Sequence, residues 1–434
     1  MSGAARPRNI VLITYDSLRT DHCSYMGYHR ETTPTLDTMA DTGVVFENAI
    51  APASRTNPAM AGTFTGEPLV VRDRVAEPEH ARSHLERHGT LAEHLRERGY
   101  ATGAFCPNAY ASRYYGFDRG FDRYEDFMFD NSLYQKLFDK HLGDSSLLTM
   151  VRNLRNLVRR QEAFKTWDTY VDEIVDWATE QTEPFFLWTF SLDTHFPYLT
   201  PRKYRQWGSL VDMYYYNWRC NQLIDEFDIE LSETQRQKIT DIYDDSIRFG
   251  DALLQELQER LSEFDPVFII HGDHGEAFDE HGIYGHFYPL LYEENVHVPL
   301  VVSGIEESAT VERPFSLLDL PSVVERAAGL EDGSLAALGD DWVFATDYDG
   351  RFERNLTAVR TAGAKYIETV TRDDEPKREF FDLRDDRHEQ RNLLPDREEA
   401  ATPLRQLVER RTSHEAELLA IEKGVTDLAA ESGL

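Results

Sequence analysis

The sequence is poor in cysteine and has no long apolar run, and each of these absences excludes a class of protein. Its three cysteines, Cys23, Cys106 and Cys220, are too few and too scattered for a disulfide framework or a cysteine-based zinc site. No segment approaches the roughly 20 apolar residues that a transmembrane helix needs. The first residues lead into a predicted strand without an apolar leader. We therefore expect a soluble, cytoplasmic protein without a membrane span.

Lysine is also sparse, and negative charge outweighs positive charge. The chain has 46 Lys and Arg residues against 78 Asp and Glu residues, and its formal net charge is -32. A surface of this charge repels nucleic acids and anionic lipids, so we expect no nucleic-acid partner. The acidic residues could form one dedicated binding face, or they could form the hydrated, salt-screened surface of a halophilic protein. Their spread along the whole chain favours the halophilic interpretation.

Hydrophobic patterning predicts the fold. With 434 residues, of which 41% are hydrophobic, the chain can build a large core. Strand-like and helix-like segments alternate, which is typical of an α/β fold whose mostly parallel sheet is flanked by helices. The predicted strands lie at 9–15, 44–49, 100–105, 185–192, 267–270 and 298–303. The predicted helices lie at 35–43, 58–64, 90–98 and 234–264.

The pattern changes towards the C-terminus. We predict a large first domain over residues 1–335, with a helical insertion at about 127–182. A small α+β domain over 336–434 follows. Its short strands and final helix are predicted at 343–346, 357–360, 365–369 and 403–422.

Three polar residues follow predicted strands and are candidate metal ligands. Asp273 and His274 come after the strand at 267–270, and Asp16 comes after the strand at 9–15. Parallel strands bring their carboxyl ends to one edge of a sheet. Two carboxylates and an imidazole suit a divalent cation. The ordinary alternative is that Asp273 and His274 cap a turn and hydrogen-bond each other.

Thr56 lies just before the helix predicted from Pro58. A hydroxyl at a helix N-cap usually has a structural role, since it satisfies a free backbone N–H. A helix N-terminus also stabilises an anion, so a tetrahedral oxyanion could bind there. A metal on the Thr56 oxygen would lower the pKa of the hydroxyl and make it a nucleophile.

The order and spacing of several motifs over residues 8–395 resemble the sulfatase family, within the alkaline phosphatase superfamily. The matching segments are 9–22, 46–66, 192–198, 272–276, 281–282, 292–294, 298–300, 381–383 and 392–393. This resemblance implies an alkaline phosphatase-like fold. It also implies metal-dependent hydrolysis of a sulfate or phosphate ester in the first domain.

The sequence departs from the family pattern at its nucleophile. Sulfatases have Cys or Ser there, which is oxidised to formylglycine, whereas Thr56 carries a β-methyl group and cannot form that aldehyde. Met60 replaces the supporting Arg, and Ser17 replaces the second Asp of the opening motif. His274 stands where many sulfatases have Asn. These changes favour phosphoester chemistry and a softer metal, Zn²⁺ or Mn²⁺, over Ca²⁺.

The resemblance also implies a role for each site residue. Asp16, Asp273 and His274 would hold the divalent metal, with Thr56 as the fourth ligand and the nucleophile. His195 and His286 match positions that contact the oxyanion or assist the leaving group, although each could be an ordinary hydrogen-bonded histidine. The predicted substrate-side residues are Asn108 and Asp193. Asp193 could instead ligate a second metal or orient His195, and of these two roles we favour the second.

Four functional hypotheses remain. The first is a phosphoester hydrolase that forms a covalent intermediate on Thr56. The second is a sulfatase that works without formylglycine, and the third is a phosphotransferase in which an alcohol replaces water. The fourth is a non-catalytic module that binds carbohydrate or phospholipid, prompted by the changes at Ser17 and Met60. In each case we expect the protein to bind an ester, which is carried by a small molecule, a glycan or a lipid.

Overall fold

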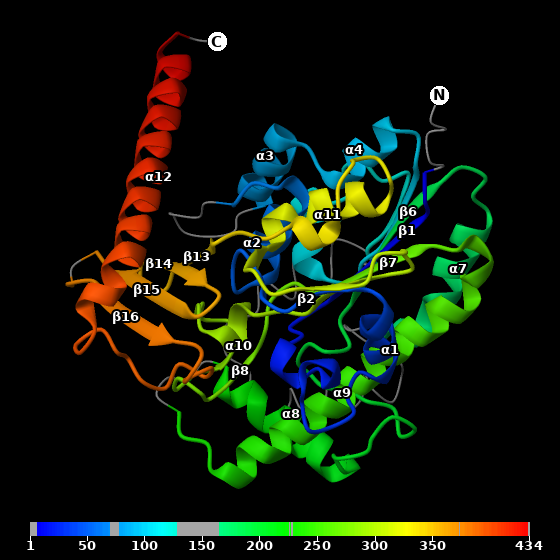
Figure 1. Ribbon diagram of the computed structural model, residues 1–434, viewed down its shortest axis with the longest axis horizontal. Helices are drawn as coiled ribbons and strands as arrows, with labels where there is room; N and C mark the ends of the chain where they lie inside the picture. Colours follow the sequence, from blue (N-terminus) through cyan, green and yellow to red (C-terminus); the bar gives the residue numbers. More distant parts are fainter. Residues whose placement is uncertain are drawn as a thin grey trace.

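A computed structural model describes residues 7–69, 78–127, 165–224, 226, 229–372 and 374–432. Its centre is an eight-stranded sheet (Figure 1). The strands are β1 (Ile10–Tyr15), β2 (Val44–Phe46), β4 (Ala101–Phe105), β5 (Arg123–Glu125), β6 (Phe185–Ser191), β7 (Val267–Gly272), β10 (Leu300–Ser303) and β11 (Ala309–Val311). Their order is β11-β2-β10-β7-β1-β6-β4-β5. Only β10 runs antiparallel to its neighbours, so the predicted, mostly parallel α/β sheet is confirmed.

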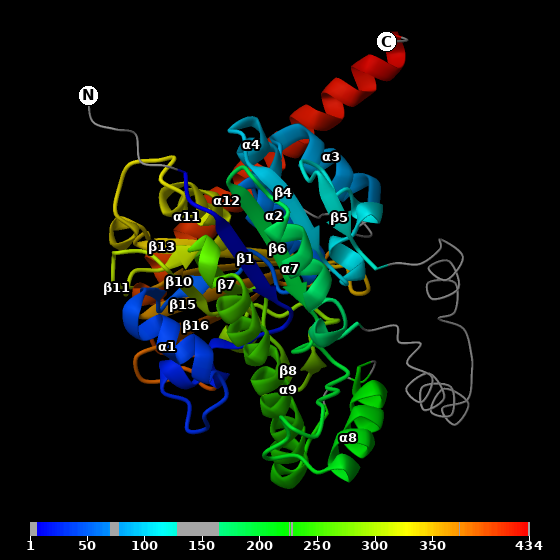
Figure 2. The ribbon, with the colours of Figure 1, turned by 90° about the vertical axis from the view of Figure 1, so that its right-hand side faces the viewer.

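Helices cover both faces of this sheet (Figure 2). Along β1, Ile10 and Leu12 belong to one core, and Val11 and Ile13 belong to the other, as the two-residue period of a strand requires. The first core contains residues of α2 (Thr56–Thr65), α3 (Pro78–His88), α4 (Leu91–Glu97) and α11 (Leu320–Ala327). The second contains residues of α1 (Pro34–Thr42), α7 (Val171–Thr179), α8 (Leu210–Leu223) and α9 (Glu233–Arg260). β1 is thus a central strand buried on both faces, and Asp16 at its carboxyl end is fully buried as well.

The C-terminal part forms a second, antiparallel sheet. It contains β13 (Trp342–Asp349), β14 (Arg354–Thr361), β15 (Ala364–Val370) and β16 (Lys377–Asp382) in that order. One face shares a core with residues of the first domain, including Ile50, Leu291 and Val296. The other face packs on α12 (Glu398–Ser432), which projects away from the body of the molecule (Figure 1). The predicted small α+β tail is thus present and packs closely against the rest of the chain.

Three sequence-based boundaries need correction. The single strand predicted at 44–49 is divided, because the chain leaves β2 and then forms β3 (Ala49–Ile50), which pairs with β12 (Phe315–Ser316) in a separate sheet. The last helix begins before Pro403, and this proline lies inside α12. Most of the predicted insertion, residues 128–164, lies outside the described residues. Its later part includes α7, whose apolar residues pack in the second core, so α7 is not part of an insertion.

The predicted domain boundary falls in η8 (Leu335–Ala337), a short 3-10 helix that precedes β13. The division into domains stays a prediction. None of the helices in the described ranges combines the length and the apolarity needed to cross a membrane.

The net charge of -32 predicts that stability depends on salt. Because like charges repel more strongly when screening is weak, we expect the melting temperature to rise by several degrees from dilute buffer to molar KCl. Thermal unfolding followed by circular dichroism would measure this shift. Sucrose in place of KCl controls for stabilisation by an excluded solute. An equal melting temperature in dilute buffer and molar KCl would contradict the halophilic interpretation.

Candidate active site

Two neighbouring strands bring the predicted metal ligands together. Tyr15 at the end of β1 lies opposite Gly272 at the end of β7, so the next residues, Asp16 and Asp273, leave the sheet side by side. Asp16, Asp273 and His274 each offer one ligand atom, and these three atoms lie within 4.8 Å of one another. All three residues are fully buried.

The turn after β7 needs glycine because the chain packs tightly there. A Cβ atom on Gly275 would lie 2.0 Å from the carbonyl oxygen of Glu294, and one on Gly272 would lie 2.8 Å from that of Leu18. The close approach of these segments, and not an unusual backbone angle, therefore excludes a side chain.

Hydrogen bonds fix the orientation of the His274 ring. Nδ1 lies 2.8 Å from the carbonyl oxygen of Gly275, which can only accept, so Nδ1 carries the proton. The lone pair of Nε2 then faces Asp273 Oδ2 at 3.4 Å and Asp16 Oδ1 at 3.7 Å. This is the tautomer in which histidine binds a metal through Nε2.

Asp273 uses its two oxygens differently. Oδ1 accepts hydrogen bonds from the backbone N–H groups of Ser17 (3.0 Å) and His274 (2.8 Å), so the turn-capping alternative holds for this oxygen. Oδ2 is buried, and it has no hydrogen-bond partner within the described residues. A buried carboxylate oxygen without a donor is costly, and a bound cation would satisfy it.

The electrostatics of the cluster also favour a cation. Burial raises the pKa of Asp16 well above its usual range, and the nearby Asp273 carboxylate raises it further. Burial lowers the pKa of His274, but the carboxylates of Asp273 and Asp16 outweigh it, and the net shift is upward. Both directions are those expected of a buried cluster that added positive charge would stabilise. Its donor set, two carboxylate oxygens and one imidazole nitrogen, fits a divalent ion such as Zn²⁺ or Mn²⁺.

Asn108 and Ser17 hold the Asp16 side chain. The Asn108 amide donates to Asp16 Oδ2 at 2.5 Å, and the Ser17 hydroxyl donates to Asp16 Oδ1 at 3.0 Å. The amide oxygen of Asn108 accepts from the backbone N–H of Tyr110. Asn108, predicted as a substrate contact, therefore orients Asp16 in this structure, and its contact with a substrate stays a prediction.

Thr56 is placed against the ligand cluster by the start of α2. Its Oγ1 lies 3.2 Å from His274 Nε2, and the residue is buried. Thr56 is the first residue of α2 and Arg55 is the N-cap, so the predicted N-cap role of Thr56 is wrong. The helix begins two residues before Pro58 because proline is accepted within the first turn. Met60 packs in the first hydrophobic core and takes no part in the site.

Two further predicted histidines gather beside the cluster. The ring centroid of His286 lies 4.4 Å from that of His274 and 5.1 Å from that of His195. Nδ1 of His195 bonds to the carbonyl oxygen of Phe196. Burial, followed by the charge of His274, keeps the pKa of His286 well below its usual range. Burial also lowers the pKa of His195, which remains partly exposed.

Glu276 is a site residue that the sequence analysis did not identify. Its Oε1 lies 2.9 Å from Nδ1 of His286, and its Oε2 accepts from the Tyr198 hydroxyl at 3.3 Å. Burial raises the pKa of this carboxyl to about 7. The pairing of β8 (Ala277–Phe278) with β9 (Tyr284–Gly285) places Glu276 beside His286. This two-stranded hairpin is too short to be predicted from sequence periodicity.

Asp193 hydrogen-bonds to residues other than His195, and its role in orienting His195 stays a prediction. Its Oδ2 accepts from the Ser191 hydroxyl at 2.6 Å and from the backbone N–H of Trp167 at 3.4 Å. Its Oδ1 is buried and has no hydrogen-bond partner in the part of the chain that the structure describes. Burial raises the pKa of this carboxyl to about 7. The carboxylate is therefore directed towards Trp167.

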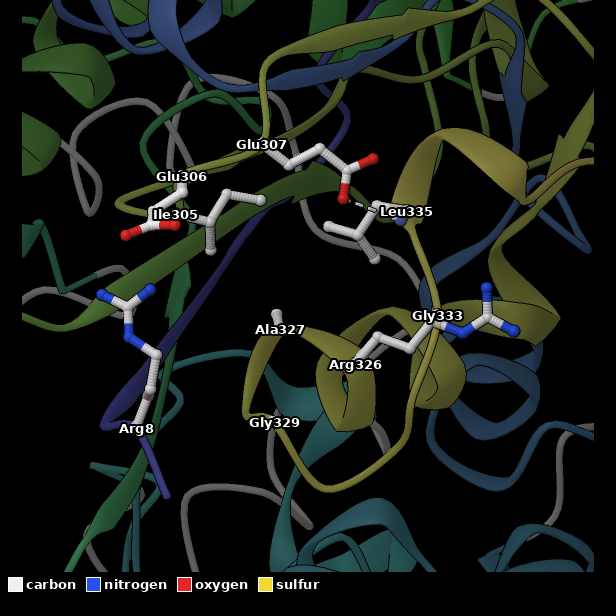
Figure 3. Close-up of a pocket in the computed structure, with 9 residues that line it drawn as sticks. All are labelled: Arg8, Ile305, Glu306, Glu307, Arg326, Ala327, Gly329, Gly333 and Leu335. Atoms are coloured by element: carbon white, nitrogen blue, oxygen red, sulfur yellow. Dashed lines mark hydrogen bonds between the residues drawn. The ribbon is translucent and has the colours of Figure 1, made fainter. Parts of the chain in front are cut away.

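The structure also contains a cavity of about 260 Å³, and Figure 3 shows the residues that line it. Its lining includes Arg8, two residues before β1, and residues 305–307, which follow the antiparallel strand β10. These positions belong to the amino-terminal edge of β1 and β7. The cavity is thus at the edge of the sheet opposite to the candidate site.

Comparison with known proteins agrees with the motifs and the geometry. Residues 8–330 match the model of the sulfatase family. Arylsulfatase A of Homo sapiens is 38% identical over 103 residues, which are 23% of this chain and 20% of that protein. The chain therefore spans about a fifth of the length of the curated relatives it matches.

Two solved structures share the fold over almost the whole chain. A phosphonate monoester hydrolase of Agrobacterium radiobacter superimposes with a TM-score of 0.65 at 20% identity, covering 95% of this chain and 96% of that one. A putative sulfatase from Bacteroides thetaiotaomicron gives a TM-score of 0.65 at 17% identity, covering 95% and 92%. At these identities the likeness concerns the fold alone. The family match over most of the sequence is the stronger finding, and the chain belongs to the sulfatase family.

Proposed function

We propose that this protein is a metal-dependent ester hydrolase that attacks a phosphoester with the hydroxyl of Thr56. The observation that carries the proposal is the position of Thr56 Oγ1, 3.2 Å from His274 Nε2 at the buried cluster of Asp16, Asp273 and His274. A nucleophile must lie within reach of the groups that activate it and orient its substrate.

Asp16, Asp273 and His274 would hold the cation. A divalent ion bound there supplies Lewis-acid stabilisation of the charge on the substrate's oxygens. Thr56 loses its hydroxyl proton to solvent, and its Oγ forms a bond to phosphorus as the ester's bond to its leaving oxygen breaks. Water then displaces the phosphoryl group from Thr56 and returns the hydroxyl.

Glu276 and His286 form the proton-transfer pair in this proposal. A proton can be shared between Glu276 Oε1 and His286 Nδ1, which lie 2.9 Å apart, so Nε2 of His286 can either donate or accept. Such a pair can protonate the leaving alkoxide in the first step and take a proton from water in the second. His195, whose ring lies beside that of His286, contacts the substrate's oxygens in this proposal.

The choice of phosphorus over sulfur rests on Thr56. A threonine cannot become the formylglycine that sulfatases use, but its hydroxyl can attack phosphorus directly. A structural neighbour with this fold is a phosphonate monoester hydrolase, which supports the choice. Sulfate esters are the second candidate because the family match favours them. The ester group can belong to a small molecule, a glycan or a lipid.

A substrate panel tests the proposed function. Aryl phosphate, phosphodiester, phosphonate and sulfate esters would be compared with Zn²⁺, Mn²⁺ and Ca²⁺ at several salt concentrations. We expect turnover of a phosphorus ester that stops after chelation and returns with added metal. Turnover of sulfate esters alone would contradict the phosphoester proposal. Turnover of no ester with any metal would favour the binding module, and product formed on an added alcohol would identify a transferase.

Glu276→Gln should reduce kcat by about 10- to 100-fold, as loss of a partner that orients a functional histidine commonly does. The amide keeps the size of the side chain but cannot share a proton with His286. Bound metal, measured by elemental analysis, should not change.

Glu294→Gln is the matched control for this variant. Glu294 is also buried and lies 2.6 Å from Nδ1 of another histidine, His281, which is not among the ligands. If Glu294→Gln lowered kcat as much as Glu276→Gln, the loss would come from general destabilisation and the proton-transfer role would be rejected.

A further inference from the structure

The C-terminal sheet contacts the segment that precedes Thr56. β13 is an edge strand, because β14 is its only neighbour in this sheet among the described residues. Its other edge faces residues 52–55. The backbone N–H of Thr346 donates to the carbonyl oxygen of Pro52 at 2.8 Å, and the carbonyl oxygen of Tyr348 accepts from Arg55 Nη2 at 2.7 Å.

Asp347 lies between these two backbone contacts. Its Oδ2 accepts from the backbone N–H of Ser54 (3.1 Å), from the Ser54 hydroxyl (3.0 Å) and from Arg55 Nε (3.4 Å). Its Oδ1 accepts from Arg55 Nη2 and from the backbone N–H of Tyr348. The Asp347 side chain is completely buried, whereas that of Arg55 is 29% exposed. One carboxylate therefore binds both residues that come directly before Thr56.

This contact anchors the segment before α2 without capping the helix. Arg55 is the N-cap of α2, and its side chain makes no capping hydrogen bond to the helix. The backbone that leads into Thr56 is fixed instead by Asp347, through a charge-assisted pair with planar guanidinium geometry. A nucleophile that moves by about 1 Å can lose about 100-fold in rate, so the anchor of this segment matters for chemistry.

We infer that Asp347 is a positioning residue that holds Thr56 in its reactive place, and that the C-terminal sheet is thereby part of the catalytic unit. The inference rests on the proposed nucleophilic role of Thr56. It adds a residue of the C-terminal sheet to the groups that place Thr56, and this residue lies almost 300 positions after Ser54 in the sequence.

Asp349 provides a matched control on the same strand. It is also buried and paired with an arginine, Arg354, at 2.6 Å. Its other partners are the backbone N–H groups of Arg351 and Phe352. All of these partners belong to the turn between β13 and β14 or to β14 itself. Asp349→Asn therefore removes a comparable ion pair and no hydrogen bond to the segment before Thr56, so it also controls for the weaker effect of the Asp349 charge on Arg55.

The test compares Asp347→Asn with Asp349→Asn and Thr56→Ala, using the full chain and the best ester of the substrate panel. We expect Asp347→Asn to lower kcat at least about 10-fold, because a displaced nucleophile slows the chemical step. KM and bound metal should stay close to the parent values. Asp349→Asn should lower the melting temperature by a similar amount and leave kcat almost unchanged.

The three variants separate failure of the inference from failure of the proposed function. If Thr56→Ala is inactive while Asp347→Asn and Asp349→Asn have the same kcat, Asp347 has no positioning role. If Thr56→Ala keeps the parental kcat, the proposed function itself fails. If Asp347→Asn does not fold, Ser54→Ala replaces it, since it removes only the hydroxyl bond to Asp347. A kcat for Ser54→Ala equal to that of the parent would then overturn the inference.

Discussion

Thr56→Ala should reduce turnover of a phosphoester by several orders of magnitude, as loss of a covalent nucleophile usually does. The fold should survive, because Thr56 is the first residue of α2 and does not cap it. Alanine is at least as favourable in a helix, so we expect the free energy of unfolding to change by no more than about 1 kcal/mol. Steady-state kinetics and thermal unfolding would measure the two effects.

Two other replacements at this position act as controls. Thr56→Ser keeps the hydroxyl and loses only a methyl group, so partial activity should remain. Thr56→Cys should not create a sulfatase, because Met60 occupies the place of the supporting Arg and lies in the hydrophobic core. Turnover by Thr56→Ala close to that of the parent would mean that water attacks the ester directly.

Asp273→Ala and His274→Ala should each abolish both metal binding and turnover. Each change removes one of the three converging ligand atoms. Asp273→Ala also leaves the backbone N–H groups of Ser17 and His274 without their acceptor, which costs about 1–3 kcal/mol for each unsatisfied group. Asp273→Asn avoids this problem, since its amide oxygen can still accept from both groups. Metal content and kcat would be measured for all three variants.

Asp251→Asn is the matched control for Asp273→Asn. Asp251 is buried and accepts from two backbone N–H groups, those of Thr35 and Leu36, but it lies outside the ligand cluster. It should therefore keep its metal and its activity. Full metal occupancy in both Asp273→Asn and His274→Ala would show that the metal is bound elsewhere.

The fold could be predicted from the sequence where local patterns are strong. The apolar, β-branched run of β1 and the long amphipathic helix α9 were both placed within a few residues. The predicted ends of helices and strands were wrong where tertiary contacts determine them. β3 separates from β2 because it pairs with β12, and α7 belongs to the core because its apolar face is covered by the sheet.

The same distinction applies to the site. Asp16 and Asp273 could be predicted, because parallel strands bring their carboxyl ends together. Glu276 was missed, because it meets His286 through a hairpin of two-residue strands. The contact of Asp347 with Arg55 joins segments almost 300 residues apart, and neither residue carries a local signal of it. The bonds of Asp193 to Ser191 and Trp167 also could not be predicted, because Trp167 lies 26 residues away and carries no local signal of the contact.

The most direct test of the central claim is to trap the covalent intermediate. The metal-loaded protein would be mixed with a fast aryl phosphoester and quenched in acid within the first turnover. Its peptides would then be analysed by mass spectrometry. The proposed mechanism predicts one phosphoryl group on Thr56 in the parent and none at this position in Thr56→Ala. Product release without any phosphorylated peptide, together with parental turnover in Thr56→Ala, would contradict it.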